Sequence, residues 1–281
     1  AVLLASALAT PMSPVAASPA SAYAIDKTPP SIFPVGGTQG DMGAGLAGRT
    51  IKVGGDWAYP PFEYLDESGM PAGFNVDLTR ALARTIGLPM EIHLSSWIEA
   101  RTSLERGELD MLMGMFKSPE RAGLADFTAP HFVTVYRVFA RKDSGIKRLE
   151  DIRNAWIAAQ NGDLGHEYLL ENGYGHRLIV MNDWTDLFKA VVRREADCVV
   201  ASTLQGWQAI DQKQFSSIEA VSTPLFSAEY CMAVRKGDAD LLAAVDEGLS
   251  VLRMTGEYKA LYDKWFGDYD ESGGGSVTGV I

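Results

Sequence analysis

The chain has 281 residues, of which 47% are hydrophobic and 22% are charged, a composition typical of globular proteins rather than of disordered chains. Its formal net charge of −11 argues against nucleic-acid binding, because phosphate neutralisation needs clustered Lys and Arg. The two cysteines, Cys198 and Cys231, lack the C-x-x-C spacing of redox or zinc sites. Both lie in apolar runs and are expected in the core, with a single bridge between them as the alternative in an oxidising compartment.

The first 49 residues predict export and a linker. Residues 1–9 form an apolar run that is too short to span a bilayer, and the small-x-small sequence Ala22-Tyr23-Ala24 follows it. This pattern predicts a secretory signal peptide, with a low-complexity Ala/Pro tail as the alternative. Residues 26–48 are rich in Gly and Pro and predict a flexible linker. The G-x-G-x-x-G sequence at 43–48 is not interpreted as a dinucleotide site, because no strand is expected before it and a strand is expected after it.

Strands and helices alternate from residue 50. The pattern predicts strands over 51–55, 90–94 and 109–113, and helices over 76–86 and 98–106. Gly87 and Pro89 follow the first helix as stop signals. This βαβαβ order predicts a parallel sheet covered by helices.

A second series begins near residues 156–159 and repeats features of the first. In each series a tryptophan stands 13 residues before an aspartate, across a helix and into a strand: Trp97 before Asp110, and Trp184 before Asp197. A Gly-Asp pair also follows the first strand of each series: Gly55-Asp56 and Gly162-Asp163. These matches predict two α/β lobes of similar build. A ligand site is expected in the crevice between them, beyond the carboxyl ends of the strands.

The C-terminal part predicts two further helices and a linker. Apolar residues at helical spacing over 241–252 indicate an amphipathic helix closed by Gly256, and 259–266 adds a further helical turn or two. Residues 268–281 are dense in Gly and Ser and predict a flexible C-terminal linker.

Four strings resemble, in family order, motifs of the extracytoplasmic solute-binding proteins of family 3, the amino-acid-binding type. They are Val53-Gly54-Gly55-Asp56-Trp57-Ala58-Tyr59-Pro60-Pro61-Phe62-Glu63-Tyr64, Gly73-Phe74-Asn75-Val76-Asp77-Leu78, Ser118-Pro119-Glu120-Arg121 with Asp126-Phe127-Thr128-Ala129-Pro130-His131, and residues 257–267. The resemblance covers residues 50 to 267.

The resemblance implies an α/β, two-lobed periplasmic-binding-protein fold of type II, the venus flytrap. Lobe 1 would hold residues 50–129 plus 233–267, and lobe 2 residues 134–228. Two short crossing strands, near 129–133 and 228–232, would form the hinge. Ligand binding would favour the closed arrangement of the lobes.

The resemblance also implies a ligand-binding set. Arg121 would bind the ligand α-carboxylate, since a guanidinium offers two parallel donors to a carboxylate; the alternative is a surface arginine paired with Glu120 or Asp126. Tyr59 and Trp97 would form aromatic walls around the ligand side chain.

Three further residues belong to the same expected site. Asp56 follows the first strand, where its carboxylate could reach a ligand amine. Gly114 would let the ligand approach the backbone, because it has no side chain. Ser118, in the motif of Arg121, is also expected to bind the ligand.

Three positions depart from the family pattern. Phe116 and Asp163 stand where Thr is common, and Ser202 stands where an Asp usually binds the α-amino group. Either Asp163 supplies the amine anchor from another direction, or the ligand lacks a standard α-amino group. A buried, unpartnered carboxylate is costly, so Asp163 is expected to meet a cation, a hydrogen-bond donor or water.

The departures resemble sensor modules of histidine kinases and diguanylate cyclases. We therefore expect a periplasmic or otherwise extracytoplasmic sensory module for an amino acid or related carboxylate, linked to membrane-bound signalling domains of the same gene product. The alternative is a free receptor for the permease of an ABC transporter. A dehydratase-type enzyme is a third interpretation, disfavoured because the sequence has no G-x-S-x-G elbow and no P-loop. No cofactor, metal site or nucleic-acid partner is expected.

Overall fold

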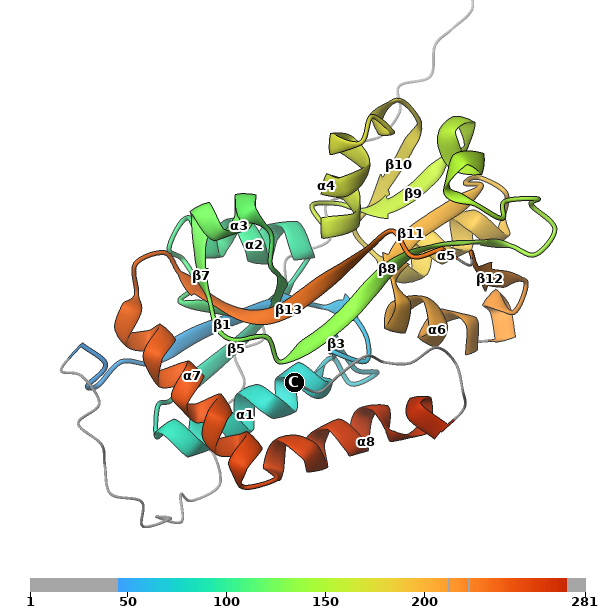
Figure 1. The fold of residues 1–281 in the computed structure, drawn as a ribbon. Coiled ribbons are helices and arrows are strands. Elements are labelled where there is room, and N and C mark those ends of the chain that lie inside the picture. The colour runs from blue at the N-terminus through green and yellow to red at the C-terminus, as the bar shows by residue number, and fades with distance from the viewer. Residues whose placement is uncertain (1–44, 212, 222, 272–281) are drawn as a thin grey trace, which may run out of the picture.

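The computed structural model describes residues 45–211, 213–221 and 223–271 (Figure 1). The predicted signal peptide and most of the predicted N-terminal linker lie outside these residues. Within them, no helix is both long enough and apolar enough to cross a membrane.

The first lobe is built on the predicted parallel strands. β1 (Ile51–Asp56) lies between β5 (Met90–Ser95) and β6 (Met111–Phe116), and pairs with both in parallel. Two helices connect these strands: α1 (Phe74–Ile86) and α2 (Trp97–Glu105). A small antiparallel sheet follows β1, made of β2 (Ala58–Tyr59), β3 (Glu63–Leu65) and β4 (Pro71–Ala72). The lobe continues through α3 (Pro119–Leu124) and β7 (Ala125–Phe127).

Helix α1 shows why the sequence pattern predicted this lobe. Its apolar residues at helical spacing are buried, and Gly87 ends it at φ 68°, a left-handed conformation that glycine adopts readily. The buried side of α1 packs against α7 (Ala239–Met254) and α8 (Glu257–Glu271), so the C-terminal helices return to the first lobe (Figure 1).

The second lobe repeats the arrangement. β9 (Ile157–Gln160) pairs in parallel with β10 (Leu178–Met181) and with β11 (Cys198–Ser202). Its α-helices are α4 (Leu164–Glu171), α5 (Trp184–Val192) and α6 (Thr203–Asp211). Short 3₁₀ helices lie at Leu149–Asn154, Gly175–Arg177 and Lys213–Phe215. β12 (Ile218–Ala220) pairs with the long strand β8 (Phe132–Arg141).

Two long strands join the lobes. β8 (Phe132–Arg141) and β13 (Phe226–Arg235) pair with each other in antiparallel fashion; β8 also pairs with β11, and β13 with β6 (Figure 1). One sheet therefore runs through both lobes in the order β10-β9-β11-β8-β13-β6-β1-β5. The crossing strands are longer than the short segments expected at 129–133 and 228–232, because each continues as a paired strand of a lobe.

The predicted internal repeat is confirmed by equivalent hydrogen bonds of Asp110 and Asp197 in the two lobes. Asp110 accepts a bond from the Lys52 backbone N–H at 2.9 Å, and Asp197 accepts one from the Trp156 backbone N–H at 2.8 Å. Each aspartate returns a bond from its own N–H to the carbonyl of the same partner. The two aspartates thus join equivalent strands in the two lobes.

Two other expectations concern the cysteines and the C-terminal helix. Cys198 and Cys231 are buried and unbridged, so the core interpretation holds. Helix α8 runs to Glu271, whereas the flexible linker was expected to start at 268. The Trp265 indole N–H donates to Asp77 at 3.0 Å, which attaches α8 to α1. Residues 272–281 of the predicted linker lie outside the described residues.

Candidate functional site

The structure brings most of the predicted site residues together where the lobes meet. Eight of the nine are buried, and Ser118 is half-buried. The buried ones are Asp56, Tyr59, Trp97, Gly114, Phe116, Arg121, Asp163 and Ser202. Their side chains come from both lobes, so closure of the lobes determines which atoms touch.

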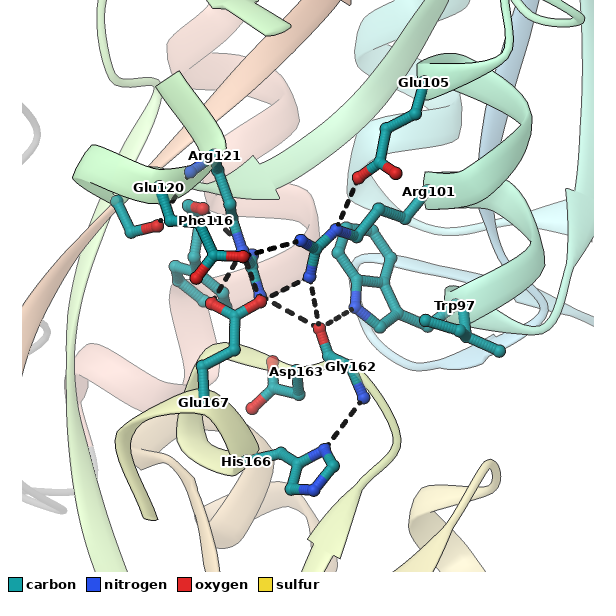
Figure 2. A network of polar contacts seen from close by, with 12 residues as sticks. Trp97, Arg101, Glu105, Phe116, Glu120, Arg121, Gly162, Asp163, His166 and Glu167 are labelled. Carbon is teal, nitrogen blue, oxygen red and sulfur yellow. Dashed lines mark hydrogen bonds and ion pairs between the residues drawn. The ribbon is translucent and has the colours of Figure 1, made fainter. Parts of the chain in front are cut away.

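Arg121 lies at the centre of a polar network (Figure 2). It sits in α3, a short helix that Ser118 caps by accepting a bond from the Arg121 N–H at 3.2 Å. The guanidinium Nη1 donates to the Phe116 carbonyl at 3.0 Å, and Nη2 donates to the Gly162 carbonyl at 3.0 Å. Ser118 and Phe116 therefore hold Arg121 from within its own lobe, while Gly162 reaches it from the other.

Glu167, on α4 of the second lobe, is the ion-pair partner of Arg121. The Nε–Oε2 and Nη2–Oε1 distances are both 3.1 Å. Neither Glu120 nor Asp126, the partners weighed from the sequence, takes this position. Glu167 was not predicted from the sequence, although it lies four residues after Asp163 on the helix that the second Gly-Asp pair opens.

A second arginine of the first lobe reaches the same carboxylate. Arg101, on α2, contacts Glu167 and donates to the Gly162 carbonyl at 3.4 Å (Figure 2). It also donates to Glu105 at 2.9 Å and lies 3.8 Å from Glu120. Two arginines of one lobe therefore converge on one carboxylate of the other.

The aromatic residues line the same junction. The Trp97 indole N–H donates to the Gly162 carbonyl at 2.8 Å, and the Arg121 guanidinium carbon lies 5.6 Å from the centre of the Trp97 ring. Tyr59 contacts Ser202 of the second lobe, with 3.4 Å between the hydroxyl oxygens, and stacks on Phe62 at 5.2 Å between ring centres. The two predicted walls therefore make contacts with the opposite lobe.

The two Gly-Asp pairs place two buried carboxylates here. Asp56 accepts from the Ala58 N–H at 3.0 Å and from the Gln160 amide, across the lobes, at 2.5 Å. Asp163 accepts from the Tyr136 hydroxyl and from the Gly165 N–H, each at 2.9 Å. This confirms the expectation that Asp163 meets hydrogen-bond donors. Burial raises the pKa of Asp56 to about 7 and also raises the pKa of Asp163, because it disfavours the charged form.

Gly114 lies close to the side chains of Tyr230 and Asn75. A Cβ there would lie 2.3 Å from the Tyr230 hydroxyl oxygen and 2.6 Å from the Asn75 amide nitrogen. The missing side chain therefore makes room for Tyr230, and the approach of a ligand to the Gly114 backbone stays a prediction. Asn75 and Tyr230 also hydrogen-bond to Glu63, whose pKa burial raises to about 8. This cluster contacts Tyr59 through Tyr230, whose ring centre lies 6.2 Å from that of Tyr59.

Among the residues that the structure describes, no group of three or more His, Cys, Asp or Glu side chains is placed to hold a metal ion.

Residues 51–268 match the family of bacterial extracellular solute-binding proteins, family 3. The chain belongs to this family. Among curated relatives, amino-acid-binding protein AabA of Dichelobacter nodosus is 30% identical over 213 residues, which cover 73% of this chain and 83% of that protein. The L-cystine-binding protein TcyJ of Escherichia coli K12 is 26% identical over 222 residues, covering 78% and 83%.

Solved structures agree with this membership. A histidine kinase sensor domain with similarity to periplasmic binding proteins is 40% identical to this chain, with a TM-score of 0.75. The match covers 78% of this chain and 96% of the sensor domain. A mutant of ArgBP from T. maritima is 30% identical, with a TM-score of 0.72 and coverage of 78% and 95%. An ancestral amino acid-binding protein described as a precursor of cyclohexadienyl dehydratase is 29% identical, with a TM-score of 0.70 and coverage of 77% and 95%. The two-lobed periplasmic-binding-protein fold is confirmed, and most of these relatives are binding proteins.

Proposed function

We propose that this chain is an extracytoplasmic sensory module that binds an amino acid or a related carboxylate between its lobes. The observation that carries the proposal is Arg121, a buried guanidinium that faces the opposite lobe and already holds a carboxylate in this structure. A planar guanidinium binds carboxylates through two parallel bonds, so the same atoms suit a ligand carboxylate.

The remaining residues take supporting roles in this proposal. Tyr59, Trp97 and Phe116 supply the apolar walls for the ligand side chain, and the Phe116 carbonyl fixes the Arg121 guanidinium. Ser118 caps the helix that carries Arg121. Ser202 and Gly114 act through the tyrosines that they contact, Tyr59 and Tyr230.

Asp56 and Asp163 are the two candidates for binding a ligand amine. Burial disfavours the charged form of both carboxylates. A ligand ammonium beside either one would restore the ionised form and gain a charge-assisted hydrogen bond. Asp163 stands on the second lobe, as the family's usual amine anchor does, so we place the amine there and assign Asp56 to the interlobe bond with Gln160.

The sensory role rests on similarity to the histidine kinase sensor domain at 40% identity. It implies signalling domains as partners in the same gene product. A free receptor for an amino-acid ABC transporter is the second candidate, favoured by the likeness to binding proteins such as TcyJ. The coding sequence beyond residue 281 distinguishes them: a membrane span followed by a signalling domain supports the sensor, and a stop codon supports the receptor. We assign no catalytic step to the site.

A thermal-shift screen tests the binding proposal. The panel holds the twenty amino acids, their des-amino acids and their decarboxylated amines, each run with the wild type, Arg121→Ala and the exposed-arginine control Arg106→Ala. A ligand at 100 times its Kd adds ~2.7 kcal/mol to the free energy of unfolding. We expect amino acids to stabilise the wild type and Arg106→Ala but not Arg121→Ala. Stabilisation of Arg121→Ala by the same amino acids contradicts the role of Arg121, and a panel without any shift contradicts the ligand class.

The screen also decides the amine anchor. If des-amino acids stabilise the wild type as well as amino acids do, Asp163 binds no amine and the ligand class changes. If only amino acids act, Asp163→Asn should lose binding while Asp56→Asn retains it.

A further inference from the structure

The carboxylate-binding arginine of this cleft is occupied by the protein itself. The Arg121 side chain is 1% exposed and that of Glu167 14% exposed, and their oxygen–nitrogen distances are those of a charged pair. Glu167 thus presents to Arg121 the same chemical group that a carboxylate ligand would present.

This ion pair crosses from one lobe to the other. Arg121 on α3 and Arg101 on α2 belong to the first lobe, and Glu167 on α4 belongs to the second (Figure 2). The other carboxylates near Arg101 are Glu105 and Glu120, and both belong to the first lobe. Among the pairs described in this network, those of Glu167 are therefore the ones that resist separation of the lobes.

We propose that Glu167 is a built-in competitor for the ligand carboxylate, which holds the lobes closed in the absence of ligand. An incoming carboxylate takes Arg121, and Glu167 keeps its contact with Arg101. The competition part of this proposal rests on the proposed function, whereas closure without ligand does not. The signal on ligand binding is then an exchange of one carboxylate for another, rather than a simple closing of open lobes.

The energetics favour this arrangement over an empty closed cleft. A buried guanidinium that loses its carboxylate partner is strongly destabilised, because its charge is left without water or a counter-charge. Asp163 also interacts with Arg121, but burial disfavours the charged form of Asp163. Without Glu167, separation of the lobes therefore hydrates Arg121. The bonds from Trp97 and Arg121 to the Gly162 carbonyl are neutral-acceptor bonds, and they do not replace the missing charge.

The test uses the ligand-free full chain, refolded from denaturant to remove copurified small molecules. Spin labels at the exposed positions Glu108 and Glu171, introduced as E108C and E171C, report the distance between the lobes by pulsed electron paramagnetic resonance. The native Cys198 and Cys231 are buried and are left in place. The test variant is Glu167→Gln. The matched control is Glu120→Gln, which removes a carboxylate from the same arginine cluster without removing a bond between the lobes.

We expect wild type and Glu120→Gln to give one short, narrow distance distribution, and Glu167→Gln to give a longer or broader one. A Glu167→Asp variant, which keeps the charge but shortens its reach, should lie between them. The proposal is overturned if Glu167→Gln superimposes on the wild type, or if the wild type is already open.

A second measurement reports on Arg121 directly. Phenylglyoxal modifies accessible arginines, and peptide mass spectrometry reads the extent of modification at Arg121. We expect Arg121 to react at least tenfold faster in Glu167→Gln than in wild type or Glu120→Gln, and equal rates would contradict the proposal. Neither measurement uses an amino acid. Opening of Glu167→Gln therefore supports closure by Glu167 even if the binding panel fails, and a successful panel does not rescue closure if the lobes stay shut.

Discussion

The two lobes are alike in backbone and unlike in chemistry. Each has a Gly-Asp pair near the carboxyl end of a parallel strand, within β1 in lobe 1 and after β9 in lobe 2. The aspartate of each pair accepts a bond from the N–H two residues on: Asp56 from Ala58 and Asp163 from Gly165. In each lobe one helix begins with a tryptophan. In each lobe a separate aspartate joins two strands. The repeat therefore accounts for the scaffold of both lobes.

The residues that face the junction do not repeat. Lobe 1 contributes two arginines, Arg101 and Arg121, and lobe 2 contributes the carboxylate of Glu167. The Trp97 indole N–H donates to the other lobe, whereas that of Trp184 is buried without a hydrogen-bond partner, although the Trp184 ring also faces the other lobe, 6.0 Å from the ring centre of Tyr59. A repeat thus predicts where strands and helices lie, but not the charges that hold the lobes together.

The largest expected effect separates the two tryptophans. Trp184→Ala should lower the free energy of unfolding by ~3–5 kcal/mol, as large-to-small changes in a core do. Trp97→Ala should cost at least ~1 kcal/mol less, because Trp184 packs in the main core, whereas Trp97 packs in a smaller cluster of buried residues. Urea denaturation measures both values. Equal costs would show that Trp97 is an ordinary core residue.

A pH effect is expected from the buried cluster of lobe 1. Burial raises the pKa of Glu63 from 4.5 to about 8, so the folded chain keeps a proton that the unfolded chain releases. This contribution to stability is complete below pH 4.5 and declines up to about pH 8, by at most ~1.4 kcal/mol per pH unit. Glu63→Gln should flatten this part of the profile in urea titrations at successive pH values. A variant profile parallel to that of the wild type would contradict the assignment.

The strand-joining aspartates test the repeat itself. Asp197→Ala should cost ~1 kcal/mol, the value of a lost hydrogen bond. Asp110→Ala should cost ~2 kcal/mol, because Asp110 also accepts a bond from Arg49 at 2.9 Å. Thermal unfolding of the two variants measures the difference. If Asp197→Ala proves the more costly change, the two positions are not energetically equivalent strand junctions.

The smallest effect concerns the hydroxyl contact between the lobes. The Tyr59–Ser202 distance of 3.4 Å marks a weak hydrogen bond. Tyr59→Phe should therefore change the free energy of unfolding by less than ~0.5 kcal/mol. Trp97→Phe, which loses a 2.8 Å hydrogen bond, should lower it by ~1 kcal/mol. A larger cost for Tyr59→Phe than for Trp97→Phe would show that Tyr59, and not Trp97, makes the stronger uncharged hydrogen bond between the lobes.

Much of this molecule could be predicted from its sequence. The alternation of strands and helices, the repeat and the family all follow from local patterns and motifs. The donors to Asp163 were predicted as a class, because a buried carboxylate requires them. The partners themselves, Tyr136 and Gly165, were not.

The ion pair of Arg121 and Glu167 could not be predicted. The two residues are 46 positions apart and lie on different lobes. The contact that requires a glycine at position 114 could not be predicted for a similar reason, since it is imposed by Tyr230, far along the chain. Local sequence carries secondary structure and motifs, whereas contacts between lobes depend on how the lobes are placed.

The most direct test of the central claim follows the Nε–H resonance of Arg121 by nuclear magnetic resonance, assigned with Arg121→Lys. In the Glu167→Gln protein this resonance should move away from its wild-type position, because the internal carboxylate is gone. Adding amino acids from the panel should return it toward that position, since a ligand carboxylate replaces Glu167. A resonance that the panel leaves unmoved would contradict the claim that Arg121 is the carboxylate-binding group of this cleft.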